Sequence, residues 1–145
     1  MSTRSDVESA VEGAVEVIAC ATCGGAERDA EGRTKGEQLF AELRAARGDA
    51  SRVSVSSVRC LWACKNRCTV HVRGPGRFGY VIGQLEPTGE HARAVLDYAL
   101  LYAESAEGTV PFRQVPQPLK GHFVCRIPKP SDTAPPERAE PSAED

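Results

Sequence analysis

The amino-acid sequence predicts an α/β domain, and three observations lead to that class. Short runs in which apolar and polar residues alternate are typical of half-buried strands. Two longer segments instead repeat their apolar residues at the spacing of a helix that faces a core. A chain of 145 residues, 41% hydrophobic and 26% charged, has the size and composition of one globular domain. Strands and helices that follow one another in this way predict a sheet with helices packed on it.

The first strand and the first helix are separated by a turn-rich segment. Residues Ala14–Ala19 alternate and predict a strand. The stretch 21–33 is rich in glycine, alanine and charge, and we expect a loop there. Thr34 and Glu37 form a capping box, in which each side chain satisfies a free backbone amide of the other residue. Apolar residues on one face predict a helix over Lys35–Arg47, ended by the glycine that follows it.

Three further strands and a second helix are predicted downstream. Valines at positions 53, 55 and 58 mark the second strand. The alternating runs 69–73 and 78–82 are joined by a turn rich in glycine and proline, so they predict a β-hairpin. Pro87-Thr88 begins a helix whose apolar residues keep helical spacing, and Gly108 is expected to close it.

The order strand, helix, three strands, helix fits a thioredoxin-like layer, that is, a small mixed sheet flanked by helices. Prolines at 111, 116 and 118 predict extended, irregular chain over 110–127. Residues 128–145 hold five of the ten prolines and many charges, which predicts a disordered C-terminal tail. Residues 1–13 are expected to form a flexible N-terminus, which leaves 14–127 as the folded domain.

Composition excludes several classes of partner. The net charge is −2 and the isoelectric point is about 6.0, whereas a nucleic-acid binder usually carries a basic excess. Aromatic residues make up 6% of the chain, too few for a platform that stacks single strands. Residues 1–14 contain no apolar run typical of a signal peptide or a membrane anchor. We therefore expect a cytoplasmic protein with neither a nucleic-acid nor a membrane partner.

The cysteines carry most of the functional information in the sequence. Five of the six lie in two groups, Cys20-x2-Cys23 and Cys60-x3-Cys64-x3-Cys68, and each group directly follows a predicted strand. If the two strands are neighbours in the sheet, their carboxyl ends bring the groups together. The x3 spacing places the second group on one face of a helical turn. In a reducing compartment such cysteines are more often metal ligands or redox groups than structural disulfides.

Thiolates of this number predict a soft metal or an iron–sulfur cluster, and argue against magnesium, calcium or manganese. Four thiolates suit a tetrahedral zinc ion, and two separate pairs suit a [2Fe–2S] cluster whose irons each take two protein sulfurs. The spacing alone does not separate the two. A third interpretation is a thiol–disulfide oxidoreductase that uses Cys20 and Cys23, although it leaves three cysteines without a role.

The remaining candidate ligands have weaker support. Cys125 stands alone in an apolar stretch and is interpreted as a small buried hydrophobic residue outside the site. A histidine-ligated centre needs two histidines beside the cysteines, and the positions of His71, His91 and His122 do not suggest such an arrangement.

The second cysteine group also carries an aromatic residue and several positive charges. Trp62 lies between two cysteines, where it either shields a cluster, docks a partner or packs against the sheet edge. Arg59, Lys65 and Arg67 make the segment basic. Positive charge favours thiolates and attracts an acidic partner, and a merely solvated loop is the alternative.

Both cysteine segments resemble those of known families. Cys60–Lys65 (CLWACK) resembles the second ligand pair of thioredoxin-like [2Fe–2S] ferredoxins, which include the small iron–sulfur subunit of NADH dehydrogenase. Roughly residues 15–128 more closely resemble a family of small bacterial metal-binding proteins of unassigned function, sometimes encoded near cobalamin-synthesis genes. The stretches that carry this resemblance are Cys20–Cys23 (CATC), Cys60–Cys68 (CLWACKNRC), Gly74–Gly83 (GPGRFGYVIG) and Gly108–Phe112 (GTVPF).

The resemblance implies a thioredoxin-like fold and a [2Fe–2S] cluster for one-electron transfer. By position it makes Cys20, Cys23, Cys60 and Cys64 the ligands. Two residues separate Cys20 from Cys23, whereas many thioredoxin-like ferredoxins have four or more at this place. Cys68 is additional to the four-ligand pattern, so it either replaces Cys23 or is a further thiol near the cluster.

The implied function is electron transfer to a redox partner protein, in cobalamin or another cofactor biosynthesis, rather than turnover of a substrate. The alternative from the same resemblance is a zinc-binding structural or metal-handling protein linked to cobalamin metabolism. Assembly as a homodimer is left open by the sequence.

Overall fold

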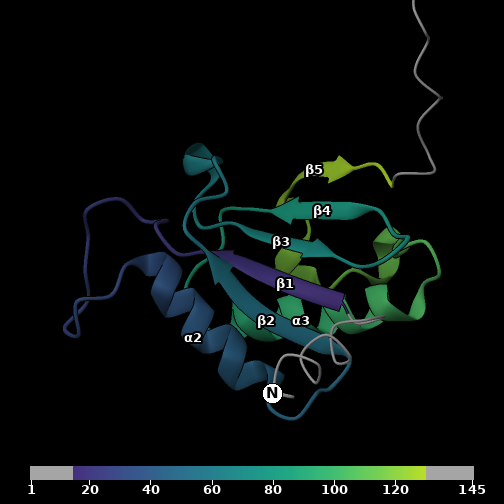
Figure 1. The fold of residues 1–145 in the computed structure, drawn as a ribbon, viewed down its shortest axis with the longest axis horizontal. Coiled ribbons are helices and arrows are strands. Elements are labelled where there is room, and N and C mark those ends of the chain that lie inside the picture. Colours follow the sequence, from purple (N-terminus) through teal and green to yellow (C-terminus); the bar gives the residue numbers. More distant parts are fainter. Residues whose placement is uncertain (1–14, 130–145) are drawn as a thin grey trace, which may run out of the picture.

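The computed structural model describes residues 15–129, whose fold is shown in Figure 1. The helices and strands are β1 (Val15–Cys20), α2 (Lys35–Arg47), β2 (Val53–Val58), β3 (Val70–Arg73), β4 (Gly79–Ile82), α3 (Gly89–Glu104) and β5 (Phe123–Ile127). Short 3₁₀ turns at Cys64–Asn66, Phe112–Gln114 and Gln117–Leu119 lie in the connections. The predicted flexible N-terminus, and the predicted tail from residue 130 onward, lie outside the described residues.

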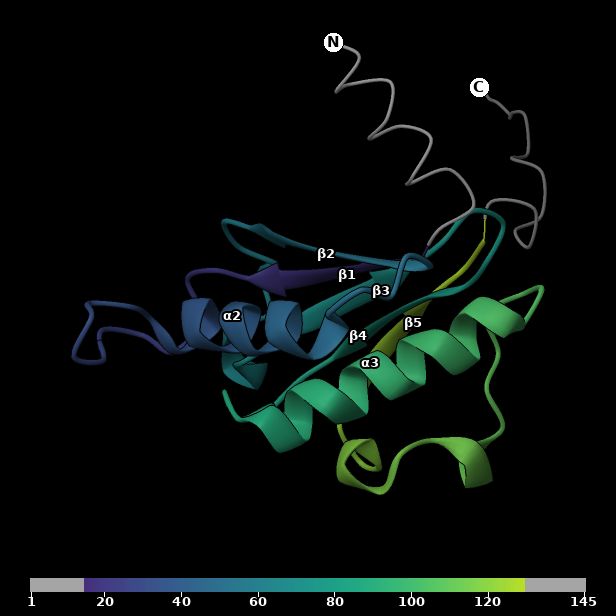
Figure 2. The same cartoon turned by 90° about the horizontal axis from the view of Figure 1, so that it is seen from below.

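The strands form one mixed sheet in the order β2-β1-β3-β4-β5. β1 and β2 run parallel, whereas the other neighbouring pairs are antiparallel. Figure 2 shows α2 and α3 on the same face of this sheet. The predicted α/β class, a small mixed sheet with helices packed on it, is therefore confirmed.

The core fills the space between the sheet and the two helices. Val15, Val17 and Ala19 alternate along β1 and are completely buried, together with Leu39 and Leu43 of α2. Because successive side chains of a strand point to opposite faces, these three β1 residues share one face. Burial of each large aliphatic side chain contributes about 1.5–3 kcal/mol of hydrophobic free energy. The core therefore fixes the register of β1 and the position of the residues that follow it.

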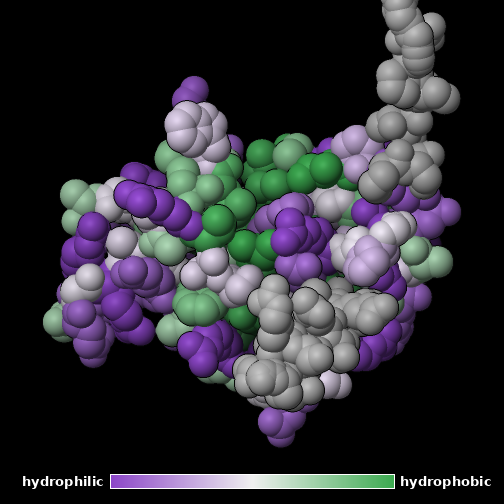
Figure 3. Space-filling model, in the orientation of Figure 1, coloured by the Kyte–Doolittle hydropathy of each residue, from purple (hydrophilic) through white to green (hydrophobic). Residues whose placement is uncertain are grey.

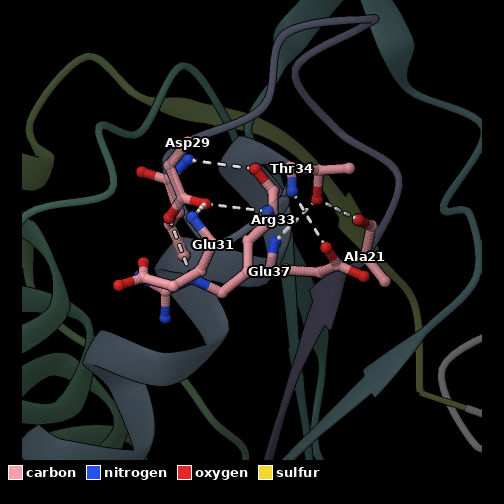
Figure 4. A network of polar contacts seen from close by, with 7 residues as sticks. Ala21, Asp29, Glu31, Arg33, Thr34 and Glu37 are labelled. Atoms are coloured by element: carbon pink, nitrogen blue, oxygen red, sulfur yellow. Dashed lines mark hydrogen bonds and ion pairs between the residues drawn. The ribbon is translucent and has the colours of Figure 1, made fainter.

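The capping box predicted before the first helix is present, and the helix has the predicted bounds. Thr34 Oγ1 accepts a hydrogen bond from the Glu37 amide at 2.9 Å, and the Glu37 carboxylate accepts one from the Thr34 amide at 2.9 Å. Figure 4 shows both bonds. Gly48 ends α2 with φ of 53°, in the left-handed region that glycine adopts most readily.

The expectation of irregular chain over 110–127 is wrong at its end, where β5 pairs antiparallel with β4. All three prolines of the segment lie before Gly121, so none removes a backbone donor from the strand. The Phe123 ring also packs edge-on against Tyr98, with ring centroids 5.3 Å apart. The prolines instead accompany the two 3₁₀ turns that precede β5.

The second predicted helix ends earlier than expected. α3 stops at Glu104 because Ser105 has extended backbone, and the Ser105 hydroxyl accepts the Thr109 amide at 2.9 Å to hold the turn that follows. Gly108, with φ of 79°, lies within that turn. At the other end of the described chain, Lys129 Nζ lies 3.4 Å from the Glu107 carboxylate. Within residues 15–129 the structure contains no helix long and apolar enough to cross a membrane.

Candidate metal centre

Two segments meet at the carboxyl ends of β1 and β2, as predicted from the positions of the cysteines. The turn after β1 runs beside the segment after β2, because the Ala21 amide donates to the Val58 carbonyl at 2.8 Å and the Thr22 amide donates to the Arg59 carbonyl at 3.2 Å. The Thr22 hydroxyl donates to the same Arg59 carbonyl at 2.7 Å. The parallel pairing therefore continues past the strands and brings the two cysteine groups side by side.

The N-terminus of α2 closes on the turn that carries Cys20 and Cys23. The Gly36 amide donates to the Cys23 carbonyl at 3.0 Å, and the Thr34 hydroxyl donates to the Ala21 carbonyl at 2.6 Å. A Cβ atom at Gly36 would lie 2.0 Å from the Cys20 carbonyl oxygen. Only glycine permits this approach of the helix to the turn. The cysteine turn is thus held between β2 and the first residues of α2.

The loop between this turn and α2 is tied down by Asp29, as Figure 4 shows. Its carboxylate accepts the Glu31 amide at 3.0 Å and the Arg33 amide at 2.8 Å, and pairs with Arg33 Nε at 2.9 Å. The hydrogen bond from the Arg33 amide is the main reason that the pKa of Asp29 is lowered. These bonds anchor the chain directly before the Thr34 cap.

Three free thiols are buried together where the segments meet. Cys20, Cys23 and Cys68 are 2%, 5% and 2% exposed. Cys68 and Cys20 donate hydrogen bonds to the Cys23 sulfur, which also accepts the Thr69 amide, and the Thr69 hydroxyl oxygen lies 3.6 Å from that sulfur. The hydrogen bond from Cys68 is the largest of the effects that lower the pKa of Cys23 to about 5. We call these three residues the thiol cluster.

The other two members of the thiol cluster are held as neutral donors. Donating to the Cys23 sulfur is the main reason that the pKa of Cys68 is raised, and burial adds to the shift. Burial is the main reason that the pKa of Cys20 is raised, although the Leu61 amide donates to its sulfur and acts in the opposite direction. The negative charge of the thiol cluster therefore falls on Cys23, where Cys68, Thr69 and Cys20 favour it.

Cys60 and Cys64 lie on an outer loop, residues 59–67, rather than on the predicted helical turn. Cys60 is partly buried and Cys64 is exposed. Trp62 has φ of 61°, which no right-handed helix allows, and the only helical residues are the 3₁₀ turn Cys64–Asn66. The Trp62 amide donates to the Cys60 sulfur at 3.2 Å. The loop turns here because Leu61 packs against the core and its amide faces the Cys20 sulfur.

The outer loop surrounds a surface hollow of about 470 Å³, lined by Cys60, Trp62, Ala63, Cys64, Lys65 and Asn66. The Trp62 side chain is 91% exposed, so it does not pack against the sheet edge. In Figure 1 this loop stands out beside the ends of β1 and β2, and it projects from the surface at the same place in the space-filling view of Figure 3. Among the interpretations of Trp62, shielding a centre and docking a partner are the ones that its position allows.

Cys125 is not the buried residue that the sequence predicted. It is exposed on β5, where it pairs with Val81 of β4. It is exposed because β5 is an edge strand and both helices cover the same face of the sheet. Its place next to Val81 is distinct from the turn after β1 that carries Cys20 and Cys23.

The histidines make contacts of their own. His91 of α3 and His122 face each other edge-on with ring centroids 5.6 Å apart, and each has its Nδ1 engaged by backbone, at the Glu86 amide and the Gly83 carbonyl. His71 lies on β3, and burial is the main cause of its lowered pKa. Within the described part of the chain, no three Cys, His, Asp or Glu side chains are arranged to hold a metal ion.

The donor set nevertheless has the chemistry of a thiolate-bound metal site. The thiol cluster supplies sulfurs from both predicted groups, and the outer loop adds two more within the segment bonded to it. Binding a metal there replaces S–H···S hydrogen bonds with sulfur–metal bonds and releases protons, so it requires the sulfurs to rearrange. The sequence analysis does not identify Thr69 and Gly36 as residues of the site. The available clues are that Thr69 directly follows Cys68 and that Gly36 lies inside the capping box.

The fold and the site define this chain as a mixed α/β protein with a buried thiol cluster at the carboxyl ends of two parallel strands. Residues 17–129 match the family model DUF1636, which is described as a protein of unknown function. Since the match covers most of the chain, the protein belongs to this family. Comparison with curated proteins and with solved structures gives no match. The functional argument therefore depends on the site itself.

The contact between Gly36 and Cys20 predicts a large difference between two otherwise similar substitutions. Gly36→Ala should lower the free energy of unfolding by about 1–3 kcal/mol, because the new Cβ forces α2 away from the cysteine turn. Gly89→Ala, in the first turn of α3, places its Cβ 3.7 Å from the nearest side-chain atom and should change stability by less than about 1 kcal/mol. Denaturant unfolding of both variants measures this. Equal effects would contradict the close packing at Gly36.

The thiol cluster predicts an unusual titration in the metal-free, reduced protein. The pKa of Cys23 at about 5 means that one thiolate, seen by its ultraviolet absorbance, forms well below the pH at which ordinary cysteines ionise. Because this pKa is lower in the folded chain than in the unfolded chain, stability should rise with pH between about 5 and 9. Cys23→Ser should abolish both effects, whereas Cys125→Ser should preserve them. A thiolate transition that persists in Cys23→Ser contradicts the assignment.

Proposed function

We propose that this protein holds a [2Fe–2S] cluster on cysteine thiolates and passes single electrons to a partner protein. The observation that carries the proposal is the thiol cluster, in which three cysteines from two distant segments are buried together beside a loop with two further cysteines. A cluster of this kind, when bound, accepts and releases one electron. The rest of the argument concerns what the residues of this chain do.

The contacts of the thiol cluster favour a particular ligand set. Cys20 and Cys68 are buried around Cys23 and both act on its pKa, and Cys60 directly precedes Leu61, whose amide acts on the Cys20 sulfur. The resemblance instead assigns Cys64 as a ligand and leaves Cys68 as the additional thiol. Since Cys68 is buried and Cys64 is exposed, the geometry favours Cys20, Cys23, Cys60 and Cys68.

The surroundings of the sulfurs suit an electron-transfer site. The Thr69 amide, the Thr69 hydroxyl and the Leu61 amide lie against the sulfurs of Cys23 and Cys20. Hydrogen bonds to ligating sulfurs reduce their negative charge and so raise the reduction potential of the metal they bind. The first residues of α2, closed on the same turn, add the positive end of a helix dipole.

Burial argues against the thiol–disulfide oxidoreductase. Such an enzyme needs a thiolate that its substrate disulfide can reach. Cys23, whose pKa is lowered, is only 5% exposed, so a substrate disulfide does not reach its sulfur. The low pKa of Cys23 is therefore better suited to binding a metal than to attacking a disulfide.

A zinc-binding protein is the second candidate, and one observation favours it. The thiol cluster gathers three buried cysteines in one place, so after these sulfurs rearrange a single ion needs only one more sulfur to complete a tetrahedral site. A [2Fe–2S] cluster spreads the same four sulfurs over two irons. A role in cobalamin or another cofactor biosynthesis, as the resemblance implies, is compatible with either metal.

The outer loop supplies a surface for an acidic redox partner. Trp62 projects into solvent, and Arg59, Lys65 and Arg67 around it are exposed. Exposed aromatic residues flanked by arginine are the residue types that contribute most at protein interfaces. Positive charge around them attracts an acidic protein and accelerates its association. A partner docked here contacts the hollow lined by Cys60 and Cys64.

The metal itself gives the first prediction from this proposal. Protein purified without oxygen should contain two irons and two sulfides per chain and should give the EPR signal of a reduced [2Fe–2S] cluster. Cys20→Ser, Cys23→Ser and Cys68→Ser should lose or alter that signal, whereas Cys64→Ser and the matched control Cys125→Ser should keep it. Zinc in place of iron and sulfide, also after reconstitution, would establish the second candidate. Retention in Cys68→Ser with loss in Cys64→Ser would restore the ligand set of the resemblance.

The charge of the outer loop gives a second prediction. Oxidation of the reduced protein by an anionic acceptor such as ferricyanide should slow severalfold as salt is raised, because salt screens the attraction. Lys65→Glu with Arg67→Glu should remove this salt dependence and leave the EPR signal unchanged. Arg113→Glu, away from the outer loop, is the control and should retain it. Rates that do not respond to the loop charges would show that electrons leave at another surface.

A further inference from the structure

A second hollow, which none of the thiol cluster or outer-loop residues lines, lies between α3, the end of the sheet and the segment 110–121. It has a volume of about 320 Å³ and is lined by Tyr80, Tyr98, Val110, Phe112, Val115, Gly121 and Phe123. We call it the aromatic hollow. Figure 2 shows the segment leaving the end of α3, running along that helix and returning to β5. Its volume is at the lower end of the range for small-molecule sites, which are mostly apolar with a few polar groups.

Aromatic rings form most of the walls of the aromatic hollow. Tyr80 and Phe123 meet at 87° with ring centroids 5.8 Å apart, and Tyr98 meets Phe123 edge-on at 67° with centroids 5.3 Å apart. Rings fixed edge-to-face in this manner offer both faces and edges to a further flat ring. Phe112, on the outer wall, is 69% exposed. An apolar residue so exposed at the mouth of a hollow gains a contact when a ligand is bound.

The hydroxyl groups of Tyr80 and Tyr98, which both line the aromatic hollow, make no hydrogen bond to residues 15–129, and Tyr98 is the more deeply buried of the two. Tyr98 is 2% exposed. Among residues 15–129, His71 Nε2 is the only fully buried side-chain nitrogen or oxygen atom without a hydrogen bond. The Tyr98 hydroxyl has no hydrogen bond either, so its oxygen atom is not fully buried and is open to solvent. Because Tyr98 lines the hollow, the hydroxyl is available there as a hydrogen-bond donor. Burial raises the pKa of Tyr98, which keeps the proton on that oxygen.

The segment that runs from the aromatic hollow to the end of the described chain carries positive charge only. No aspartate or glutamate occurs between Gly108 and Lys129, whereas Arg113, Lys120, Arg126 and Lys129 do. Lys129 pairs with Glu107, and the Arg126 guanidinium lies over the Phe78 ring. Lys120 and Arg113 have no carboxylate partner in the described part of the chain, and Lys120 Nζ lies 4.7 Å from the Phe112 ring centroid. The mouth of the hollow therefore favours an anion.

We propose that the aromatic hollow is a binding site for a small planar aromatic carboxylate whose ring carries a hydrogen-bond acceptor. The ring of this ligand lies among Tyr80, Tyr98, Phe112 and Phe123. Its acceptor atom accepts a hydrogen bond from the Tyr98 hydroxyl, and its carboxylate stays at the mouth of the hollow near Lys120. This site does not depend on the metal centre, so it stands or fails separately from the proposed electron-transfer function.

Three probe molecules test each part of this proposal on the full-length protein. Quinoline-3-carboxylate has the flat ring, the acceptor nitrogen and the charge. 2-Naphthoate lacks the nitrogen, and quinoline lacks the carboxylate. NMR titration should show saturable shifts for quinoline-3-carboxylate in residues of α3, β4, β5 and the segment 110–121. Its affinity should exceed that of 2-naphthoate by about threefold to tenfold, the value of one hydrogen bond.

Variants assign these differences to individual groups. Tyr98→Phe should make the affinities for quinoline-3-carboxylate and 2-naphthoate equal. Lys120→Gln should weaken both carboxylates severalfold and leave quinoline unchanged. Phe112→Ala should weaken all three, and since that side chain is largely exposed the variant should fold. Phe40→Ala on α2 and Lys129→Gln are matched controls that should change nothing. Absence of saturable binding, or binding that Tyr98→Phe and Phe112→Ala leave intact, would overturn the proposal.

Discussion

The close approach of α2 to the carbonyl of Cys20 is the constraint on which the site depends. Gly36 has no Cβ, so the helix can begin directly against the turn, with its amide bonded to the Cys23 carbonyl. The same turn is bonded on its other side to the segment that follows β2. The cysteine turn is therefore fixed from two directions by backbone contacts. Cys68 and Thr69, which follow the outer loop and begin the approach to β3, complete the enclosure of the Cys23 sulfur.

This enclosure determines the chemistry of the thiols. In a low-dielectric setting a lone thiolate is unfavourable, and three adjacent thiolates are more so. The structure resolves this by placing one negative charge on Cys23 and keeping Cys20 and Cys68 as donors to it. A metal cation offers the same sulfurs a stronger source of positive charge, because it favours the deprotonated form of every thiol that it binds. The metal-free arrangement is thus close in composition, though not in geometry, to a thiolate-bound centre.

Much of the frame was predictable because it depends on local patterns. The Thr34–Glu37 capping box set the start of α2, and the alternation in β1 set the face that Val15, Val17 and Ala19 bury. The meeting of the two cysteine groups followed from parallel strands that end at one edge. The pattern was also sufficient for the β3–β4 hairpin.

The remainder depended on contacts between distant residues. The x3 spacing suggested one helical face for Cys60, Cys64 and Cys68, but the packing of Leu61 and the left-handed backbone of Trp62 turn the chain so that only Cys68 is fully buried. The sequence does not predict β5, because this strand is five residues long and follows a segment with three prolines. It is stabilised by its pairing with β4 and by the packing of Phe123 on Tyr98, which are contacts between distant residues. Cys125 is exposed because both helices cover the other face, which is a property of the whole sheet.

The most direct test of this account is X-ray absorption at the iron and zinc edges of the protein as purified without oxygen. The account predicts iron whose first shell consists only of sulfur, with a second iron as its nearest metal neighbour. It also predicts that Cys68→Ser changes this first shell while Cys64→Ser does not. Zinc without iron, or iron bound mainly by oxygen and nitrogen, would contradict the claim that the thiol cluster is built for a [2Fe–2S] centre.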